Sequence, residues 1–181
     1  MKQRPFWLVY GISLYHCAMS WLMPRVLSDR KAVIRYYKKK SGGRIVDVDH
    51  PVLFSEKMQW YKLHHHDPLM QVVANKYTVR EYIESIGYGR LLNDLIGVYN
   101  NVDQIDFDKL PNQFVLKGSH GSGFNIIVRD KSQLNKRRAK MLMRSWLRQH
   151  IAWSGREWVY EKMPRHIIAC LLYTSDAADD K

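Results

Sequence analysis

Residues 113–130, QFVLKGSHGSGFNIIVRD, constrain the fold more than any other part of the chain. Two short apolar runs of β-forming residues, 114–116 and 126–128, flank a lysine and a loop with three glycines and two serines. Loops of this type commonly bind phosphates, because glycine lets backbone N–H groups approach an anion closely. The segment therefore predicts two antiparallel strands joined by a glycine-rich loop, with Lys117 at the base of the loop.

The order of residues in this loop excludes three familiar nucleotide-binding loops. Phe124 follows the last glycine, where a P-loop requires lysine and then serine or threonine. A Rossmann loop opens a helix, whereas a second strand follows here. Ile126 stands where a kinase glycine-rich loop has its third glycine. A flap that closes over phosphates and a glycine-rich hairpin without a ligand both remain open.

Two lysines lie in apolar surroundings. Lys117 ends the first apolar run, and Lys76 interrupts a row of apolar residues at helical spacing. That row consists of Val72, Val79 and Ile83. A bound polyphosphate would neutralise both lysines. The alternative is that the stems pack while the ammonium groups reach water, which needs no ligand.

Five motifs occur in an order that resembles the TupA-like ATP-grasp family of bacterial cell-envelope polysaccharide and teichuronopeptide biosynthesis. They are FSEKMQW (54–60), ANKYTVREYI (74–83), GVYN (97–100), FVLKGSHGSGFN (114–125) and WSGREWVY (153–160). The first and fourth are the most specific, and the resemblance covers residues 45–169. It implies an ATP-dependent ligase that holds ATP between two α+β subdomains. Such enzymes typically activate a carboxylate as an acyl phosphate.

The resemblance also implies roles for individual residues. Lys76 and Lys117 correspond to the two lysines that contact the ATP phosphates, and residues 118–125 correspond to the flap. Arg80 would support the site or the substrate, and Asn75 stands where the family often has aspartate. The predicted ATP-binding residues are Lys76, Lys117, Gly118, Ser119, His120, Gly121, Ser122, Gly123 and Asn125. ATP and Mg²⁺ are the expected cofactors, with the catalytic residues, the metal ligands and the adenine hinge expected beyond residue 169.

The last twelve residues, CLLYTSDAADDK, differ in character from the rest of the chain. Residues 170–179 match, residue for residue, the translation of a transposon-type sequencing adapter. We therefore predict that residues 170–181 are a non-native tail. In that case Cys170 occupies the place of the acidic hinge residue of the family. The chain would then be an inactive N-terminal part of an ATP-grasp fold.

The remaining pattern predicts a mixed α+β chain, with an N-terminal arm (1–44) before a partial ATP-grasp domain (45–169). We expect helices capped by Ser55 and by Asp67, a break at Asn75 and a helix end at Gly87. Residues 95–112 are rich in turn formers. A helix is expected within residues 132–151 and a strand at residues 166–169.

The arm contains an uncharged stretch, residues 5–23, just long enough to span a bilayer. Because serine, tyrosine, tryptophan and His16 dilute its hydrophobicity, a buried or interfacial helix is favoured over a transmembrane anchor. The basic residues 29–44 predict either an exposed helix that ends at Gly42 and Gly43, or a segment against acidic headgroups.

Composition limits the function classes. The formal net charge of +12 favours an anionic partner such as a nucleotide, an anionic polymer, nucleic acid or a membrane surface. Two cysteines, Cys17 and Cys170, argue against a disulfide scaffold and fit a cytoplasmic protein. The run at residues 64–66 of three histidines favours a structural or surface role over a metal site.

We expect a ligase acting on a carboxylate-bearing sugar or amino acid, without nucleic acid, in the cytoplasm or at the inner face of the membrane. Two alternatives remain open. A glycosyltransferase-like enzyme of the same pathway would need a pair of carboxylates for a metal-bound nucleotide sugar, and no convincing pair is visible. A basic, non-enzymatic protein that binds a membrane surface or nucleic acid would not depend on Lys117.

Overall fold

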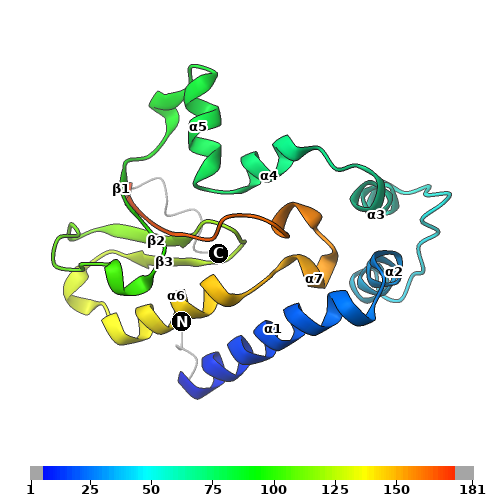
Figure 1. Cartoon of the computed structure of the whole chain (residues 1–181), viewed down its shortest axis with the longest axis horizontal. Coiled ribbons are helices and arrows are strands. Elements are labelled where there is room, and N and C mark those ends of the chain that lie inside the picture. Colours follow the sequence, from blue (N-terminus) through cyan, green and yellow to red (C-terminus); the bar gives the residue numbers. More distant parts are fainter. Residues whose placement is uncertain (1–5, 174–181) are drawn as a thin grey trace.

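A computed structural model describes residues 6–173 of the chain (Figure 1). Its centre is a four-stranded antiparallel sheet in the order β1-β4-β2-β3. The strands are β1 (Leu95–Tyr99), β2 (Phe114–Gly118), β3 (Asn125–Val128) and β4 (Ile167–Leu171). The sheet is therefore assembled from distant segments, because β4 inserts between β1 and β2 and pairs with both. The fold class is mixed α+β, as expected.

The strand–loop–strand prediction is confirmed, since β2 and β3 pair directly across the glycine-rich loop. Side chains alternate between the two faces of the sheet. Phe114 and Leu116 enter the main core, so Val115 and Lys117 lie on the opposite face. Lys117 pairs with Asn125 on β3 and with Ile168 on β4, and residues directly opposite each other share a face.

Helix α6 (Lys136–Arg148) covers the core face of the sheet. Its apolar positions recur at helical spacing, and Ala139, Met143 and Trp146 are buried in the same cluster as Phe114. The helix begins where the Asn135 side chain accepts a hydrogen bond from the amide of residue 138, at 2.9 Å. The predicted helix within residues 132–151 is thus confirmed.

Three helices precede the sheet: α3 (Phe54–His64), α4 (Pro68–Ala74) and α5 (Thr78–Ser85). Asp67 caps α4 as predicted, because its carboxylate accepts from the Leu69 amide at 2.9 Å with proline at the first helical position. Asn75 separates α4 from α5, again as predicted. Gly87, with φ of +84°, follows the end of α5.

Two predictions about this region are wrong. Ser55 does not cap α3, which begins one residue earlier after Leu53. Instead, the Glu56 carboxylate accepts hydrogen bonds from the amides of Val52 and Leu53, each at 3.0 Å. Residues 95–99, expected to be part of a turn-rich stretch, form strand β1. Pairing with β4 stabilises β1, and local sequence does not reveal such a distant partner.

The arm folds into α1 (Phe6–Val26) and α2 (Asp29–Lys40). Figure 1 shows α1 along one edge of the molecule, and it contacts α6 and the short α7 (Ala152–Gly155). Helix α2 ends at Lys40, and two glycines with positive φ follow Ser41, as predicted. No helix within residues 6–173 combines the length and the apolar character needed to cross a membrane.

Four short 3₁₀ turns complete the structure: η1 (Gly89–Leu91), η2 (Val102–Gln104), η3 (Lys131–Gln133) and η4 (Trp158–Tyr160). Residue Leu110 and the η2 residue Val102 belong to the main core. A second, smaller cluster joins α2 to the following loop through Val33, Tyr37 and Val48.

Candidate functional site

Lys76 lies directly on the glycine-rich loop. Its backbone amide donates to the carbonyl of Ser119 at 3.0 Å. Its ammonium group donates to the carbonyl of Gly118 at 3.3 Å and also to the carbonyl of Gly121. The two predicted parts of the site, which lie on separate motifs, therefore meet at one place in the fold.

Lys117 is close enough for its charge to act on Lys76. Burial, and then the positive charge of Lys117, lower the pKa of Lys76 below its ordinary value. Within the described residues, no carboxylate forms an ion pair with either lysine. Two neighbouring positive charges that have no ion-paired carboxylate attract an anion. A polyphosphate carries enough negative charge to pair with both lysines.

The hydrogen bonds of Asn75 show why an asparagine stands where the aspartate of the resemblance was expected. Its side chain is fully buried, and its amide nitrogen donates to the Pro164 carbonyl at 2.9 Å. Its amide oxygen accepts from the Tyr77 amide at 2.9 Å, at the start of α5. Aspartate could accept this second bond but could not donate the first. Asparagine therefore fastens Lys76 to the segment that leads into β4.

The first part of the loop is anchored in the protein interior by Ser119 and His120. The Ser119 hydroxyl donates to the Pro164 carbonyl at 3.2 Å and accepts from the His166 amide at 3.0 Å. The Ser119 amide donates to the His166 carbonyl at 2.9 Å. These bonds occupy the Ser119 side chain, which is fully buried. In this structure the hydroxyl holds the loop onto the approach to β4.

His120 fastens the loop to α6. Its Nε2 donates to the Trp146 carbonyl at 2.8 Å, and its ring meets Phe124 edge-on. The side chain is only 2% exposed, and burial lowers the pKa of His120 to about 4. The imidazole is therefore neutral at physiological pH, and it serves as a packing and hydrogen-bonding group.

The loop glycines are required by the close approach of Phe124. A Cβ on Gly118 would lie 3.0 Å from the Cβ of Phe124, and a Cβ on Gly121 would lie 2.7 Å from its ring. Phe124 in turn stacks on Trp146, with ring centroids 5.4 Å apart. Gly123 has φ of +73°, a conformation that other residues rarely adopt. These glycines are needed to fold the loop whether or not a ligand binds.

The tip of the loop is open to solvent. Ser122, Gly123 and Asn125 are exposed, in contrast to the buried residues 118–121. Of the residues predicted to bind ATP, the structure brings Lys76 onto the loop and places Lys117 opposite Asn125. It places the side chains of Ser119 and His120 on the interior side of the loop.

Comparison with known families identifies this arrangement. The sequence matches the family model described as TupA-like ATPgrasp over residues 56–179. The chain belongs to the TupA-like ATP-grasp family. Comparisons with curated proteins and with solved structures found no match. Family membership indicates an ATP-grasp enzyme with ATP as its ligand, and ATP-grasp enzymes typically use Mg²⁺ as well.

The ATP-grasp match includes most of the residues predicted to be a non-native tail, but it does not show whether they are native. The match continues past residue 169, and Cys170 and Leu171 lie in register within β4. Cys170 itself is buried opposite Val115. The proposal that residues 170–181 are non-native stays a prediction, and residues 174–181 lie outside the described part.

The part of the chain that the structure describes shows no candidate metal site. Among residues 6–173, no group of three or more histidine, cysteine, aspartate or glutamate side chains lies close enough to hold a metal ion. The histidine run has packing contacts instead. His64 and His65 stack on Trp60 and Tyr61, with centroids 4.6 and 4.3 Å apart.

Arg80, predicted to support the ATP-grasp site, has a positioning contact in this structure. Its guanidinium donates to the side-chain and backbone oxygens of Asn93, at 3.3 and 2.9 Å. It thereby ties α5 to the segment before β1. Sequence reasoning missed Pro164 and His166, whose backbone groups hold the loop. Their only signal was their position just before the predicted last strand.

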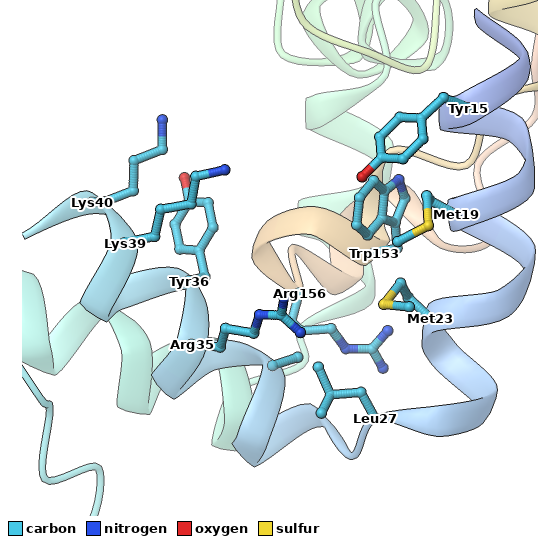
Figure 2. A pocket seen from close by; sticks show the side chains of 11 residues that line it. Tyr15, Met19, Met23, Leu27, Arg35, Tyr36, Lys39, Lys40, Trp153 and Arg156 are labelled. Carbon is cyan, nitrogen blue, oxygen red and sulfur yellow. The ribbon is translucent and has the colours of Figure 1, made fainter. Parts of the chain in front are cut away.

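A well-defined cavity lies away from the two lysines, between α1, α2 and α7 (Figure 2). Its volume is about 290 Å³, and basic side chains of α2 face apolar side chains of α1 across it. Neither Lys76 nor Lys117 lines this cavity. The cavity belongs to a different surface.

Proposed function

We propose that this chain is the ATP-binding part of a ligase that activates a carboxylate through an acyl phosphate during assembly of a bacterial surface polysaccharide or related polymer. The substrate would be a sugar or amino acid that carries a carboxylate, and the reaction would take place in the cytoplasm. The observation that supports the proposal best is the convergence of Lys76, Lys117 and the glycine-rich loop without a neutralising carboxylate.

The proposed reaction has two balanced steps. A carboxylate oxygen attacks the γ-phosphorus of ATP, and ADP leaves. An amine or similar nucleophile then attacks the carbonyl carbon of the acyl phosphate, and inorganic phosphate leaves. The two lysines would bind and neutralise the phosphate oxygens during the first step. Ser122 and Asn125, at the exposed loop tip, would lie over the phosphates.

Lys76 is suited to this role because its present partners bind its ammonium group more weakly than a phosphate would. Its ammonium is bonded to two neutral carbonyl oxygens and lies near another cation, and burial makes its charge costly. An anionic oxygen would offer a stronger, charge-assisted hydrogen bond. Binding of ATP would therefore relieve an unfavourable charge that the free protein carries.

A calorimetric titration of ATP into the 181-residue chain tests the proposal. Replacement Lys117→Ala should weaken binding by about tenfold or more, since hydrogen bonds to charged groups contribute about 1.5–3 kcal/mol. Lys109→Ala is the matched control, because Lys109 is an exposed lysine that pairs with nearby Asp106 and lies outside the glycine-rich loop. Equal affinities of the wild type and Lys117→Ala would rule out this site and favour the non-enzymatic alternative.

A further inference from the structure

Helix α1 presents an apolar stripe to solvent. Most of the exposed apolar residues recur four or seven positions apart and so share one side of the helix. They are Tyr10, Leu14, Tyr15, Trp21, Leu22 and Val26, and Ile12 is exposed as well. Trp21 is 62% exposed and Tyr15 is 56% exposed, which is unusual for such large rings. Arg25, whose guanidinium lies 4.2 Å from the centroid of the Trp21 ring, is the one charged residue on the stripe.

The opposite side of α1 is already used by the fold. Met19, Ser20, Met23 and Leu27 are buried or half-buried, and the helix contacts α6 and α7. His16 lies against Trp153 of α7, with ring centroids 6.2 Å apart. Helix α1 therefore lies lengthwise along one edge of the molecule (Figure 1), and the side chains of its apolar stripe are exposed. Exposed apolar surfaces of this extent usually mark a binding surface.

Basic side chains border the apolar stripe on both sides. On one side, Arg35, Lys39 and Lys40 of α2 face Met19 and Met23 of α1 across the cavity shown in Figure 2.

On the other side, a groove of about 420 Å³ separates Tyr10 and Leu14 from Arg144 and Arg148 of α6. An apolar ridge between cationic flanks matches the interface of a bilayer, where apolar groups enter the acyl region and cations meet phosphates.

The charge of the chain is concentrated in its N-terminal arm. Residues 1–44 contain ten lysines and arginines but only one acidic residue, Asp29. Their formal charge of +9 is three quarters of the +12 of the whole chain. Two copies of this surface would repel each other, which disfavours self-association. An anionic partner would be attracted, and tryptophan and tyrosine are the aromatic residues enriched at membrane interfaces.

We propose that α1 and α2 form a docking surface for an anionic phospholipid membrane. In this arrangement, α1 lies in the plane of the interface with its apolar stripe among the acyl chains. The cavity between α1 and α2 takes up a phosphate-bearing headgroup, with Arg35, Lys39 and Lys40 against the phosphate and the methionines against the start of the acyl chains. This surface is separate from the lysine pair at the glycine-rich loop.

Co-sedimentation of the 181-residue chain with vesicles tests the proposal. We expect binding to phosphatidylcholine vesicles that contain about 30 mol% phosphatidylglycerol, and little binding to phosphatidylcholine alone. Binding should weaken steeply as salt is raised to about 0.5 M. The double variant Lys39→Gln/Lys40→Gln should bind roughly 25-fold more weakly, since each basic residue near an anionic surface contributes about fivefold.

Matched controls test whether vesicle binding depends on this surface or on charged and apolar residues anywhere on the protein. Lys57→Gln/Arg137→Gln removes two exposed charges elsewhere and should change binding less than about twofold. Trp21→Ser/Leu22→Ser should abolish vesicle binding, whereas Leu91→Ser, at a leucine on η1 that is more exposed than Leu22, should not. All these positions are exposed, so folding should be retained, and unchanged ATP affinity of each variant would verify it.

Three results would overturn the proposal. The first is binding that does not depend on phosphatidylglycerol or on Lys39 and Lys40. The second is release from vesicles by millimolar glycerol phosphate, which would assign the cavity to a soluble phosphate. The third is a dimer in the absence of lipid that Trp21→Ser/Leu22→Ser dissociates, which would assign the stripe to a second copy of the chain.

Discussion

His120 connects the glycine-rich loop to α6 and predicts how the stability of the protein depends on pH. In the folded protein the imidazole is buried and donates to the Trp146 carbonyl, while its Nδ1 has no hydrogen-bond partner. Burial lowers the pKa of His120 to about 4. In the unfolded chain the same side chain has an ordinary pKa of about 6.5.

The sign of the effect follows from this difference. Between pH 6.5 and pH 4 the unfolded chain takes up a proton at His120, but the folded protein does not. The stabilising contribution is therefore complete above about pH 6.5 and is lost as the pH falls toward about 4. At pH 5 the free energy of unfolding should be lower than at pH 7.5 by about 2 kcal/mol from this side chain alone.

Urea unfolding of the wild type and of His120→Gln, at pH 7.5 and at pH 5, measures this contribution. Glutamine does not titrate, and its amide still offers a donor for the Trp146 carbonyl. His150 and His166, whose pKa values burial also lowers, are present in both proteins and cancel in the comparison. The wild type should lose about 2 kcal/mol more than the variant. An equal loss in both proteins would show that His120 is solvated and that the loop is not anchored as described.

Three further predictions concern the loop and its neighbours. Gly121→Ala should lower the free energy of unfolding by about 1–3 kcal/mol, because the new Cβ would lie 2.7 Å from the Phe124 ring; unchanged urea unfolding would contradict this packing. Asp67→Ala should cost about 1 kcal/mol in the same assay through loss of the α4 cap, and Asp67→Ser should restore most of it. ATP affinity should fall as the pH rises through the lowered pKa of Lys76, since only the protonated amine neutralises phosphate. Calorimetry with Lys76→Arg, which stays charged, should show a flatter profile.

Sequence alone predicted the elements that depend on local chemistry. The proline after Asp67 and the glycines after α2 and α5 marked helix ends that the structure confirms. The strand pair around the loop followed from two β-forming runs on either side of glycines. Lys76 and Lys117 stood out because each interrupts an apolar pattern, and the fold does bring their charges together.

The missed features depend on contacts between distant segments. Strand β1 contains a glycine and lies at the start of the stretch expected to be turn-rich, and it is a strand because β4 pairs with it. Helix α3 begins before Ser55 because Glu56 caps it through backbone amides, while the Ser55 hydroxyl lies 3.2 Å from that of Tyr37. No local pattern could reveal that Ser119 would be held by backbone groups next to β4.

The contacts of the loop divide its residues into two groups with different consequences for the proposed function. Residues 118–121 are held by β2, by α6 and by the segment before β4, so movement of this base would break buried hydrogen bonds. Residues 122 and 123 lie outside those contacts and are exposed, and Asn125, which is also exposed, begins β3 opposite Lys117. Lys76 lies at the boundary, because its ammonium bonds to the carbonyl of Gly121, the last residue of the base. A phosphate oxygen that binds the Lys76 ammonium must therefore displace the carbonyl of Gly121. Binding of ATP at this site would therefore replace a contact at the end of the base, next to the tip, while the buried hydrogen bonds of Ser119 and His120 keep the rest of the base in place.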